Sequence, residues 1–495
     1  MSKFTQSLLT VSASLALAAC AASSDKPAAA PAYSLDFAQQ SATQKSVEIN
    51  GQTVAYRAYE GIVYVKNPVD AEYQTLNIYV PEAYYHGQSI DGYSADTAPV
   101  FLPNQIGGYM PAKPGTPGTD SRTQQPNAAL VALSKGYVVA SPGARGRTAA
   151  TGKAPAAIVD LKAAVRYLRA NDQAMPGDAA KIISNGTSAG GALSALLGAS
   201  GNSHDYESRL KALGAANAPD DIFAVSAYCP ITDLDHADMA YEWQFNGIND
   251  YKKMNITMLD YNVKRELVPG TLTAAEITLS DQLKPLYPAY VNSLGLKDEQ
   301  GRALTLDADG NGSFKNHIAG LLAASAQGQL DAGKDLSDRN WLTIRNGKVT
   351  AVDFDQYAKA AGRQKTPPAF DAVDLSAGEN QLFGNKNTDK QHFTAFSQAH
   401  STVADATRAD AQTVNMMNPL NYIGKHSSKI PQHWRIRVGT NDRDTSLAVS
   451  AILAATLQNH GAQVNYALPW DVSHSGDYDL DELFAWMKQI SAADR

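Results

Sequence analysis

Short buried strands alternate with helices in two separate parts of this 495-residue chain, and no other feature of the sequence restricts the fold as strongly. In the first part we expect three strands, at residues 99–102, 137–140 and 181–184. The helix between the last two carries apolar residues at spacings of three and four: Ile158, Leu161, Val165 and Leu168. In the last part we expect strands at 434–438 and 464–468 and helices at 447–457 and 480–490. Such alternation predicts an α/β fold with parallel strand pairs.

The alternation disappears between the two parts, where polar helical stretches, loops and turn clusters follow one another. The aromatic residues there require burial, which argues against a long disordered insertion; they are Trp341, Phe354, Tyr357, Phe370 and Phe383. We therefore predict a core made of residues 46–240 and 417–495, interrupted by a lid domain at 241–416 that lies over the strand ends.

The first twenty residues have the pattern of a bacterial lipoprotein export signal. Lys3 supplies the positive charge, residues 8–17 are apolar, and Leu17-Ala18-Ala19-Cys20 resembles a lipobox. We predict a signal peptide at 1–19 and lipidation of Cys20, followed by a flexible tether to residue 45 whose first part is rich in Ala, Pro and Ser. The expected location is the bacterial cell envelope, on its periplasmic or outer face. The alternative is an ordinary secretory signal with a coincidental Cys.

Charge and hydropathy exclude two other classes of protein. The formal net charge is −7, so the basic face that nucleic-acid binding needs is not expected. Beyond the leader, no apolar run is long enough to cross a membrane, so the only expected membrane contact is through the lipid anchor. The expected partner is a small-molecule substrate.

A G-x-S-x-G pentapeptide lies between a predicted strand and a predicted helix. It reads Gly186-Thr187-Ser188-Ala189-Gly190, with strand residues 181–184 before it and apolar residues 192–197 after it. This is the setting of a nucleophile elbow, in which small residues allow a sharp turn that exposes the serine hydroxyl. The alternative is a glycine-rich turn without a catalytic role.

A serine nucleophile needs a base and an orienting carboxylate, and after an elbow of this type both follow later in the chain. His474 lies in the loop between the last predicted strand and the last helix, which suits the base. Asp442 follows strand 434–438 and suits the acid, although an N-cap of the next helix is the alternative. His433 and His460 border predicted elements, and we interpret both as structural.

The oxyanion that forms when a serine attacks a carbonyl group needs two N–H donors. Ala189, directly after Ser188, is the first candidate, and the loop with Gly107 and Gly108 after an early strand is the second. A Gly-Gly turn with no catalytic role is the alternative.

Two further features are interpreted as structural. Cys229, between Tyr228 and Pro230, is expected to be a buried apolar residue rather than a nucleophile. The turn at 307–312 resembles the start of a calcium loop, but Ile318 stands where the bidentate Glu should be, so a solvated turn is the stronger interpretation.

Together, these segments resemble the bacterial tannases (tannin acyl hydrolases) of the α/β-hydrolase superfamily. The matching stretches are 106–111, 186–191, 231–238, 365–371 and 442–446. The resemblance implies an α/β-hydrolase fold with a large inserted lid, and hydrolysis of galloyl esters such as hydrolysable tannins and alkyl gallates to gallate and an alcohol. It assigns the binding of the three phenolic hydroxyls to Lys365, Glu379 and Asp444, and the acid of the catalytic triad to Asp442.

The chemistry of these three residues agrees with that role. Adjacent phenolic hydroxyls offer donors to carboxylates and acceptors to an ammonium, and buried polar partners left unpaired discriminate sharply against analogues without hydroxyls. The alternative is a salt bridge in the lid between Lys365 and Glu379.

The expected enzyme is therefore a carboxylic ester hydrolase that uses Ser188 and calls for no metal or organic cofactor. A feruloyl esterase is the main alternative, and a serine peptidase of related fold a weaker one. From a different class, a non-catalytic substrate-binding lipoprotein is also considered, although intact Ser188, Asp442 and His474 argue against it.

Overall fold

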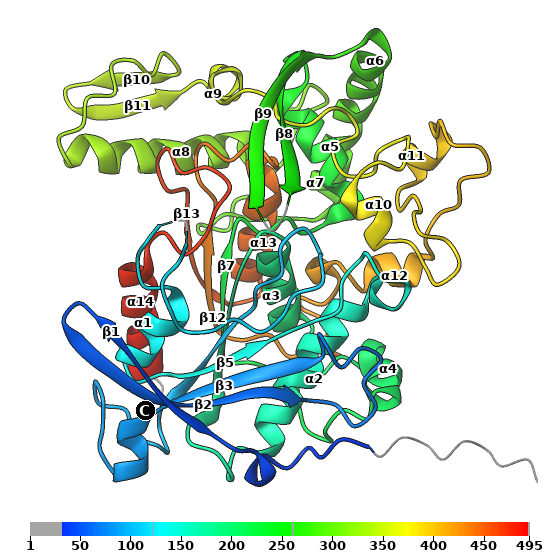
Figure 1. Ribbon diagram of the computed structural model, residues 1–495. Coiled ribbons are helices and arrows are strands. Elements are labelled where there is room, and N and C mark those ends of the chain that lie inside the picture. The colour runs from blue at the N-terminus through cyan, green and yellow to red at the C-terminus, as the bar shows by residue number, and fades with distance from the viewer. Residues whose placement is uncertain (1–31, 122, 260–261, 494–495) are drawn as a thin grey trace, which may run out of the picture. The chain divides into compact units, whose positions relative to one another are not determined.

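Nine strands form one mixed sheet in the computed structural model, which describes residues 32–121, 123–259 and 262–493 (Figure 1). Their order across the sheet is β1-β2-β3-β5-β4-β6-β7-β12-β13. Neighbours from β1 to β5 pair antiparallel, and the remaining pairs are parallel. The strands are β1 (Thr43–Ile49), β2 (Gln52–Val63), β3 (Thr75–Pro81), β4 (Pro99–Pro103), β5 (Val138–Pro142), β6 (Asp178–Thr187), β7 (Ala224–Tyr228), β12 (His433–Arg437) and β13 (Gln463–Ala467).

Helices cover the parallel strands on both faces, so every residue of β4, β5, β7 and β12 is buried. α1 (Ala128–Ser134) packs against α14 (Leu480–Ala493). α14 also contacts the sheet, since the ring centroid of Phe484 lies 5.5 Å from that of Phe101 in β4. α2 (Ala156–Ala170) packs against α3 (Ala189–Ala199), which contacts β6 and β7. α13 (Leu447–Asn459) contacts β13, and α4 (Glu207–Ala212) contacts α2.

The predicted α/β alternation is confirmed, but one central strand was not predicted. β7 lies between β6 and β12 and reads Ala-Val-Ser-Ala-Tyr, which lacks the apolar run by which the other strands are recognised. Its small residues are buried because helix α3 packs closely on it; a Cβ at Gly198 of α3 would collide with Val225.

The predicted tether differs from the structure in its last part. Phe37 is only 4% exposed, its ring lies 4.7 Å from that of Tyr59, and its N–H donates to Asn171 Oδ1 at 2.9 Å. β1 begins at Thr43, so residues that were expected to belong to the tether are packed against the sheet. The aromatic ring accounts for this, because its burial favours contact over solvation. The predicted signal peptide and Cys20 lie outside the described residues.

The insertion contains two β-hairpins that the sequence pattern did not predict, besides the expected helices. The hairpins are β8 (Asp250–Leu259) with β9 (Asn262–Thr271), and β10 (Leu342–Arg345) with β11 (Lys348–Val352). The helices are α5 (Leu234–Phe245), α6 (Ala274–Leu283), α7 (Tyr287–Ser293), α8 (Ser313–Asp331), α9 (Phe354–Ala361), α10 (Gly378–Leu382), α11 (Ala395–Ala399) and α12 (Ala411–Asn415). Short 3₁₀ helices lie at Phe37–Gln39, Glu82–His86, Ala150–Gly152, His204–Tyr206, Lys284–Leu286 and Pro419–Asn421.

The insertion shares its apolar contacts with the sheet layer. Its first part, from Trp243 to Tyr357, forms one buried cluster with apolar residues of α13, and its second part contributes Phe370 and Phe383 to the main core. The stacked rings of Trp341 and Trp470, 5.6 Å apart, connect it to the loop after β13. Figure 1 shows β8, β9, α8 and β10–β11 at one end of the strands. The predicted boundary at residue 241 falls inside α5, which continues from one part into the other.

The turn at residues 307–312 is stabilised by hydrogen bonds within the protein. In the turn at 307–312, the Asp307 carboxylate accepts the N–H groups of Asp309 and Asn311, and Lys315 Nζ donates to Asn311 Oδ1. The side chains of Asp307 and Asn311 are thus engaged within the protein. Among the residues that the structure describes, no helix combines the length and the hydropathy that a membrane span requires.

Candidate active site

A tight turn joins β6 to α3 and has Ser188 at its apex. Ser188 adopts φ 59° and ψ −123°, an unfavourable backbone conformation for a residue with a side chain. Glycines make the turn possible, because a Cβ at Gly186 would collide with the carbonyl of Gly190, and a Cβ at Gly190 with the carbonyl of Ile106. The Ser188 N–H donates to the carbonyl of Tyr228 at 3.0 Å and fastens the turn to the end of β7. The hydroxyl is thereby presented at the edge of the sheet.

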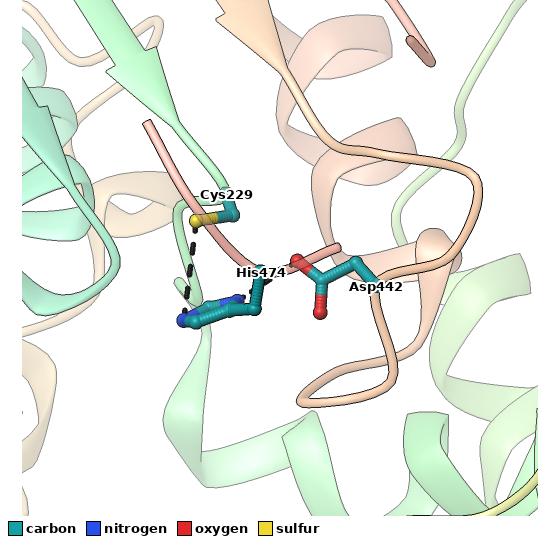
Figure 2. Close-up of side chains that lie close together, drawn as sticks. All are labelled: Cys229, Asp442 and His474. Atoms are coloured by element: carbon teal, nitrogen blue, oxygen red, sulfur yellow. Dashed lines mark hydrogen bonds and ion pairs between the residues drawn. The ribbon is translucent and has the colours of Figure 1, made fainter. Parts of the chain in front are cut away.

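Ser188, His474 and Asp442 meet at this edge. His474 Nε2 lies 2.7 Å from Ser188 Oγ, and its Nδ1 lies 2.8 Å from Asp442 Oδ2. Figure 2 shows the imidazole beside the Asp442 carboxylate, each on its own loop. The N-cap of α13 is Ser446, whose hydroxyl accepts the N–H of Ala448, so the alternative role proposed for Asp442 does not apply. This is the geometry that a serine nucleophile requires.

Two hydrogen bonds orient the buried Asp442 carboxylate. Its side chain is fully buried, and its second oxygen accepts the N–H of Asp444 at 2.9 Å. Burial alone would lower the pKa of His474, but the attraction of Asp442 outweighs it and raises this pKa well above the usual value. The hydroxyl of Tyr357 in α9 donates to the carbonyl of Thr440 at 2.7 Å, so the insertion supports the loop that carries the acid.

Cys229 is buried, as predicted, but it lies beside the same imidazole. Its Sγ is 3.9 Å from His474 Nε2 and donates to the carbonyl of Ser475 at 3.4 Å (Figure 2). Burial raises the pKa of the thiol, which keeps it protonated and weakly nucleophilic. The proximity of Cys229 to His474 could not be recognised from the sequence, because the two residues are 245 positions apart.

The loop with Gly107 and Gly108 lies next to the elbow. Gly107 and Ser188 line one cavity of about 360 Å³. Within the described part of the chain, the N–H groups of Gly107, Gly108 and Ala189 donate to no protein acceptor, so they are available to a ligand. The carbonyl of Gly107 accepts from Met110 and that of Gly108 from Arg147 Nε at 2.7 Å, which fixes the peptide planes of the loop.

Asn104 connects this loop to the elbow, and the sequence pattern did not identify it. Its Nδ2 donates to the carbonyl of Gly190 at 3.1 Å and to Ser194 Oγ at 3.1 Å, and its Oδ1 accepts the N–H of Ile106 at 3.2 Å. Asn104 follows the last residue of β4, a position at a strand end that is the only sequence signal for it.

Asp444 contacts the imidazole, and the loop of Lys365 is held next to the loop of Asp444. Asp444 Oδ2 lies 3.3 Å from His474 Nε2, and its other oxygen accepts a hydrogen bond from Gln364 Nε2. The Lys365 N–H donates to the hydroxyl of Tyr241 at 3.0 Å, and the same hydroxyl donates to the carbonyl of Arg443 at 2.9 Å. A single buried tyrosine in α5 therefore holds both loops.

Glu379 lies close to the glycine loop. It is the second residue of α10, and together with burial its charge raises the pKa of Tyr109, the residue after Gly108. Arg147 connects the same elements, since its Nη1 donates to Gln381 Oε1 at 2.5 Å. Lys365 Nζ lies 4.1 Å from the ring centroid of Phe370, and Lys365 and Glu379, both described residues, form no ion pair with each other.

Buried carboxylates hold the loop that carries Lys365 and Glu379. Asp238 of α5 accepts the N–H of Phe370 at 2.6 Å. Asp371 accepts from His392 Nδ1 at 2.8 Å, from Asn380 Nδ2 at 2.7 Å and from the N–H of Thr394 at 2.8 Å. Both acids belong to stretches that resemble the tannases, but their supporting role was not predicted from the sequence.

Two clusters of described residues have ligand atoms close enough to hold a metal ion: Cys229 with Asp442 and His474, and Asp233 with Asp235 and His236. Both imidazole nitrogens of His474 and the Nδ1 of His236 already have hydrogen-bond partners in the protein. The first cluster is the site described above, and the second lies at the start of α5.

Comparison with solved structures identifies the family. The structure of Fusobacterium nucleatum tannase matches with a TM-score of 0.89 and 52% identity, over 93% of this chain and 100% of that one. Tannase from Lactobacillus plantarum matches with a TM-score of 0.89 and 46% identity, over 92% and 100%. The chain belongs to the tannase family. A tannin acyl hydrolase in complex with ethyl gallate also matches this tannase-family chain, with a TM-score of 0.86 and 47% identity over 91% and 97%.

Two further comparisons complete this result. A family profile described as BD-FAE matches residues 117–270 of this tannase-family chain, which includes the elbow. A search of the curated protein sequences found no match. The predicted resemblance to tannases and the α/β-hydrolase fold are both confirmed.

Proposed function

We propose that the protein is a serine esterase that hydrolyses galloyl esters to gallate and an alcohol. The observation that carries the proposal is the continuous hydrogen-bonded chain from Ser188 through His474 to Asp442, with Asp444 only 3.3 Å from the reacting nitrogen. Related structures named as tannin acyl hydrolases, one with ethyl gallate and one with 3,4-dihydroxybenzoate, support the assignment of the acyl group.

The proposed reaction has two halves. In the first, His474 Nε2 takes the proton of Ser188 Oγ as the oxygen attacks the ester carbon, and the charge of Asp442 stabilises the imidazolium. The N–H groups of Ala189 and of the glycine loop hold the oxyanion, and the alcohol leaves with the proton from His474. In the second half, water attacks the acyl-enzyme in the same way and releases gallate.

Recognition of the galloyl ring is proposed for Lys365, Glu379 and Asp444. The ammonium would donate to a phenolic oxygen, and the two carboxylates would accept from phenolic hydroxyls. The support for Lys365 and Asp444 is that the Tyr241 hydroxyl bonds both to the N–H of Lys365 and to the carbonyl of Arg443, the residue before Asp444. Glu379 is supported by its position near Tyr109.

A location in the cell envelope is proposed from the leader alone. Cleavage before Cys20 and acylation of its thiol would hold the enzyme on a membrane surface. Incorporation of labelled palmitate into the full chain, and its loss in Cys20→Ser, would support this location; an unlabelled, freely exported wild-type protein would contradict it.

The decisive experiment compares Ser188→Ala with the unaltered enzyme on methyl gallate. We expect kcat/KM to fall by roughly 10⁵- to 10⁶-fold, because the remaining site has no nucleophile for the imidazole to activate. Methyl ferulate, assayed in parallel, tests the alternative of a feruloyl esterase. A higher kcat/KM on ferulate than on gallate would refute the galloyl assignment, and full turnover by Ser188→Ala would refute the nucleophile.

A further inference from the structure

The glycine loop has a backbone conformation that needs support from outside the loop. Two successive residues, Gly108 and Tyr109, have positive φ values of 55° and 56°. Tyr109 carries a bulky side chain and is only 6% exposed, so the left-handed conformation costs free energy at this residue. A flipped peptide in the loop would also turn an N–H donor away from the oxyanion. The loop therefore depends on contacts that fix the peptide planes on both sides of Tyr109.

Arg147 fixes both of these peptide planes. Its Nε donates to the carbonyl of Gly108 at 2.7 Å, and its backbone N–H donates to the carbonyl of Tyr109 at 2.8 Å. The chain approaches the loop this closely because Gly146 precedes Arg147; a Cβ at Gly146 would collide with the backbone of Pro111. One residue thus holds the carbonyls before and after the strained tyrosine.

The same guanidinium reaches the helix that carries Glu379. Its Nη1 donates to Gln381 Oε1 at 2.5 Å. Gly378, the first residue of α10, leaves room for it, because a Cβ there would lie 3.1 Å from the guanidinium carbon. Both acceptors of the guanidinium are neutral, and Arg147 forms no ion pair with any residue that the structure describes. The guanidinium is thus a planar fork between the glycine loop and α10, a geometry that a lysine cannot reproduce.

A buried lysine holds the backbone of Arg147 in turn. Lys153 is 6% exposed, and its Nζ donates to the carbonyl of Arg147 at 2.7 Å and to Asp389 Oδ1 at 2.6 Å. Gln381 Nε2 donates to Asp389 Oδ2 at 3.1 Å. Arg147, Lys153, Asp389 and Gln381 therefore form a closed ring of hydrogen bonds, which restricts the rotamers of the arginine.

We propose that Arg147 is a positioning residue that serves two parts of the reaction at once. Through Gly108 it keeps the glycine loop in the conformation that binds the oxyanion, and through Gln381 it holds α10, with Glu379, against that loop. A galloyl ring bound at Glu379 is thereby aligned with the donors that stabilise its ester carbonyl. The proposal rests on the proposed function, and it adds the residue that connects recognition of the ring to stabilisation of the oxyanion.

Two measurements separate the two connections. Labelling of Ser188 by a fluorophosphonate needs the oxyanion-binding loop but no galloyl ring, so its second-order rate constant reports on the loop. The ratio of kcat/KM for methyl gallate to that for methyl benzoate reports on ring recognition. Arg147→Met keeps an unbranched side chain and removes its donors. We expect the labelling rate constant to fall about ten-fold or more, and the ratio to fall roughly three- to ten-fold.

Gln381→Leu removes only the connection to α10. It should lower the ratio roughly three- to ten-fold and leave the labelling rate constant within about two-fold of the unaltered enzyme. Arg147→Lys keeps the charge but cannot bond to both acceptors, so we expect it to lower at least one of the two values; it replaces Arg147→Met if that protein does not fold.

Arg169→Gln is the matched control for the loss of an arginine. Arg169 is also half-buried, and its Nη2 donates to a backbone carbonyl, that of Asp221, at 2.8 Å. Arg169 lies on α2, and this substitution should leave both the labelling rate constant and the ratio unchanged.

Three results would overturn the proposal. An unchanged labelling rate constant in a folded Arg147→Met or Arg147→Lys protein, together with an unchanged ratio, would show that neither connection matters. An unchanged ratio in Gln381→Leu would show that α10 is not positioned through Arg147. Equal losses in Arg169→Gln would show a general effect on the protein. If the unaltered enzyme is labelled at Ser188 but does not hydrolyse methyl gallate, the proposed function fails, whereas the labelling comparison still decides whether Arg147 supports the loop.

Discussion

Ser188 owes its expected reactivity to groups that are remote in the chain, since His474 follows it by 286 positions. The strained turn, the imidazole at 2.7 Å and the buried Asp442 are each supported by a separate part of the molecule. Cys229 shares the same imidazole nitrogen, at 3.9 Å, and is therefore the one competing nucleophile close to the base among the described residues.

Cys229→Ala should retain most of the activity on methyl gallate, because the protonated thiol takes no part in acyl transfer. We expect kcat/KM within about three-fold of the unaltered enzyme, with a small loss of stability from the vacated volume. Steady-state kinetics and labelling by a fluorophosphonate check this prediction. Loss of both turnover and labelling in a folded Cys229→Ala protein would identify the thiol as the nucleophile.

Lys365→Met and Glu379→Gln should reduce discrimination between gallate and benzoate esters. Removing a charged partner of a phenolic hydroxyl costs about 1.5–3 kcal/mol, so the ratio of kcat/KM for methyl gallate to that for methyl benzoate should fall roughly 10- to 100-fold. Lys359→Met, at an exposed position of α9, is the control. An unchanged ratio in both site variants would contradict the assignment of these residues to the phenolic hydroxyls.

At the scale of elements, the site depends on how the insertion contacts the sheet. α5 holds the loops of Lys365 and Arg443 through Tyr241, and Arg363 of the same segment pairs with Glu242 at 2.5 Å, both side chains being fully buried. α9 supports the loop of Asp442 through Tyr357. The insertion therefore supports the loop of the proposed catalytic acid as well as the proposed ring-binding residues.

Tyr241→Phe should loosen two loops at once. The N–H groups of Gln364 and Lys365 both lose their acceptor, so we expect a lower Tm and a fall of about ten-fold in kcat/KM for methyl gallate, mainly through a higher KM. The gallate-to-benzoate ratio should fall as well, which lower stability alone would not cause.

Tyr167→Phe is the matched control for that substitution. Tyr167 is also fully buried, but its hydroxyl has no hydrogen-bond partner in the described part of the chain, so its removal should be neutral or stabilising. If Tyr167→Phe and Tyr241→Phe have the same effect on KM, the loops do not depend on the Tyr241 hydroxyl.

At the scale of the whole molecule, one ionic cluster joins the places where the chain enters and leaves the insertion. We call it the crossing cluster; it consists of Asp233, Asp235, His236, Tyr290 and Asn418. The Asp233 carboxylate bonds to His236 at 2.7 Å, to the Tyr290 hydroxyl and to Asn418 Nδ2 at 2.8 Å, and the rings of His236 and Tyr290 stack at 3.7 Å. It thereby connects α5, α7 and the segment that returns to β12.

From the crossing cluster we predict that the free energy of unfolding falls in alkaline solution. Burial alone would lower the pKa of His236, but its bonds to Asp233 and Asp235 outweigh it and raise this pKa to about 10, from an ordinary value of 6.5. Since the folded state binds the proton more tightly, the stabilisation is fully present below about pH 6.5 and is lost as the pH rises through 10.

His236→Gln should therefore lower the free energy of unfolding by about 1–3 kcal/mol at pH 7 and by much less near pH 11. Urea unfolding between pH 6 and pH 11 measures the difference, with His400→Gln at an exposed position as the control. If the free energy of unfolding depends on pH in the same way for the unaltered protein and for His236→Gln, His236 does not cause the loss of stability in alkaline solution.

Much of the fold was predictable because its signals are local. The strand–helix alternation, the elbow around Ser188 and the positions of Asp442 and His474 after strands all follow from periodicity and chain order. β7 was missed because its burial is imposed by its neighbours, and β8–β9 because a hairpin within an insertion has no core face of its own to impose an apolar pattern.

The sequence by itself determined the class of sheet, the residue at the elbow and the order of the residues that serve it, because these depend on short-range steric and hydrophobic rules. Only the tertiary structure decided which side chains converge. Cys229 lies beside His474, Asn104 lies under the glycine loop, and Asn185 donates to Asp477, although these residues come from distant strand ends and loops. Such contacts arise because parallel strands end at a common edge, and chain order does not specify which side chains meet there.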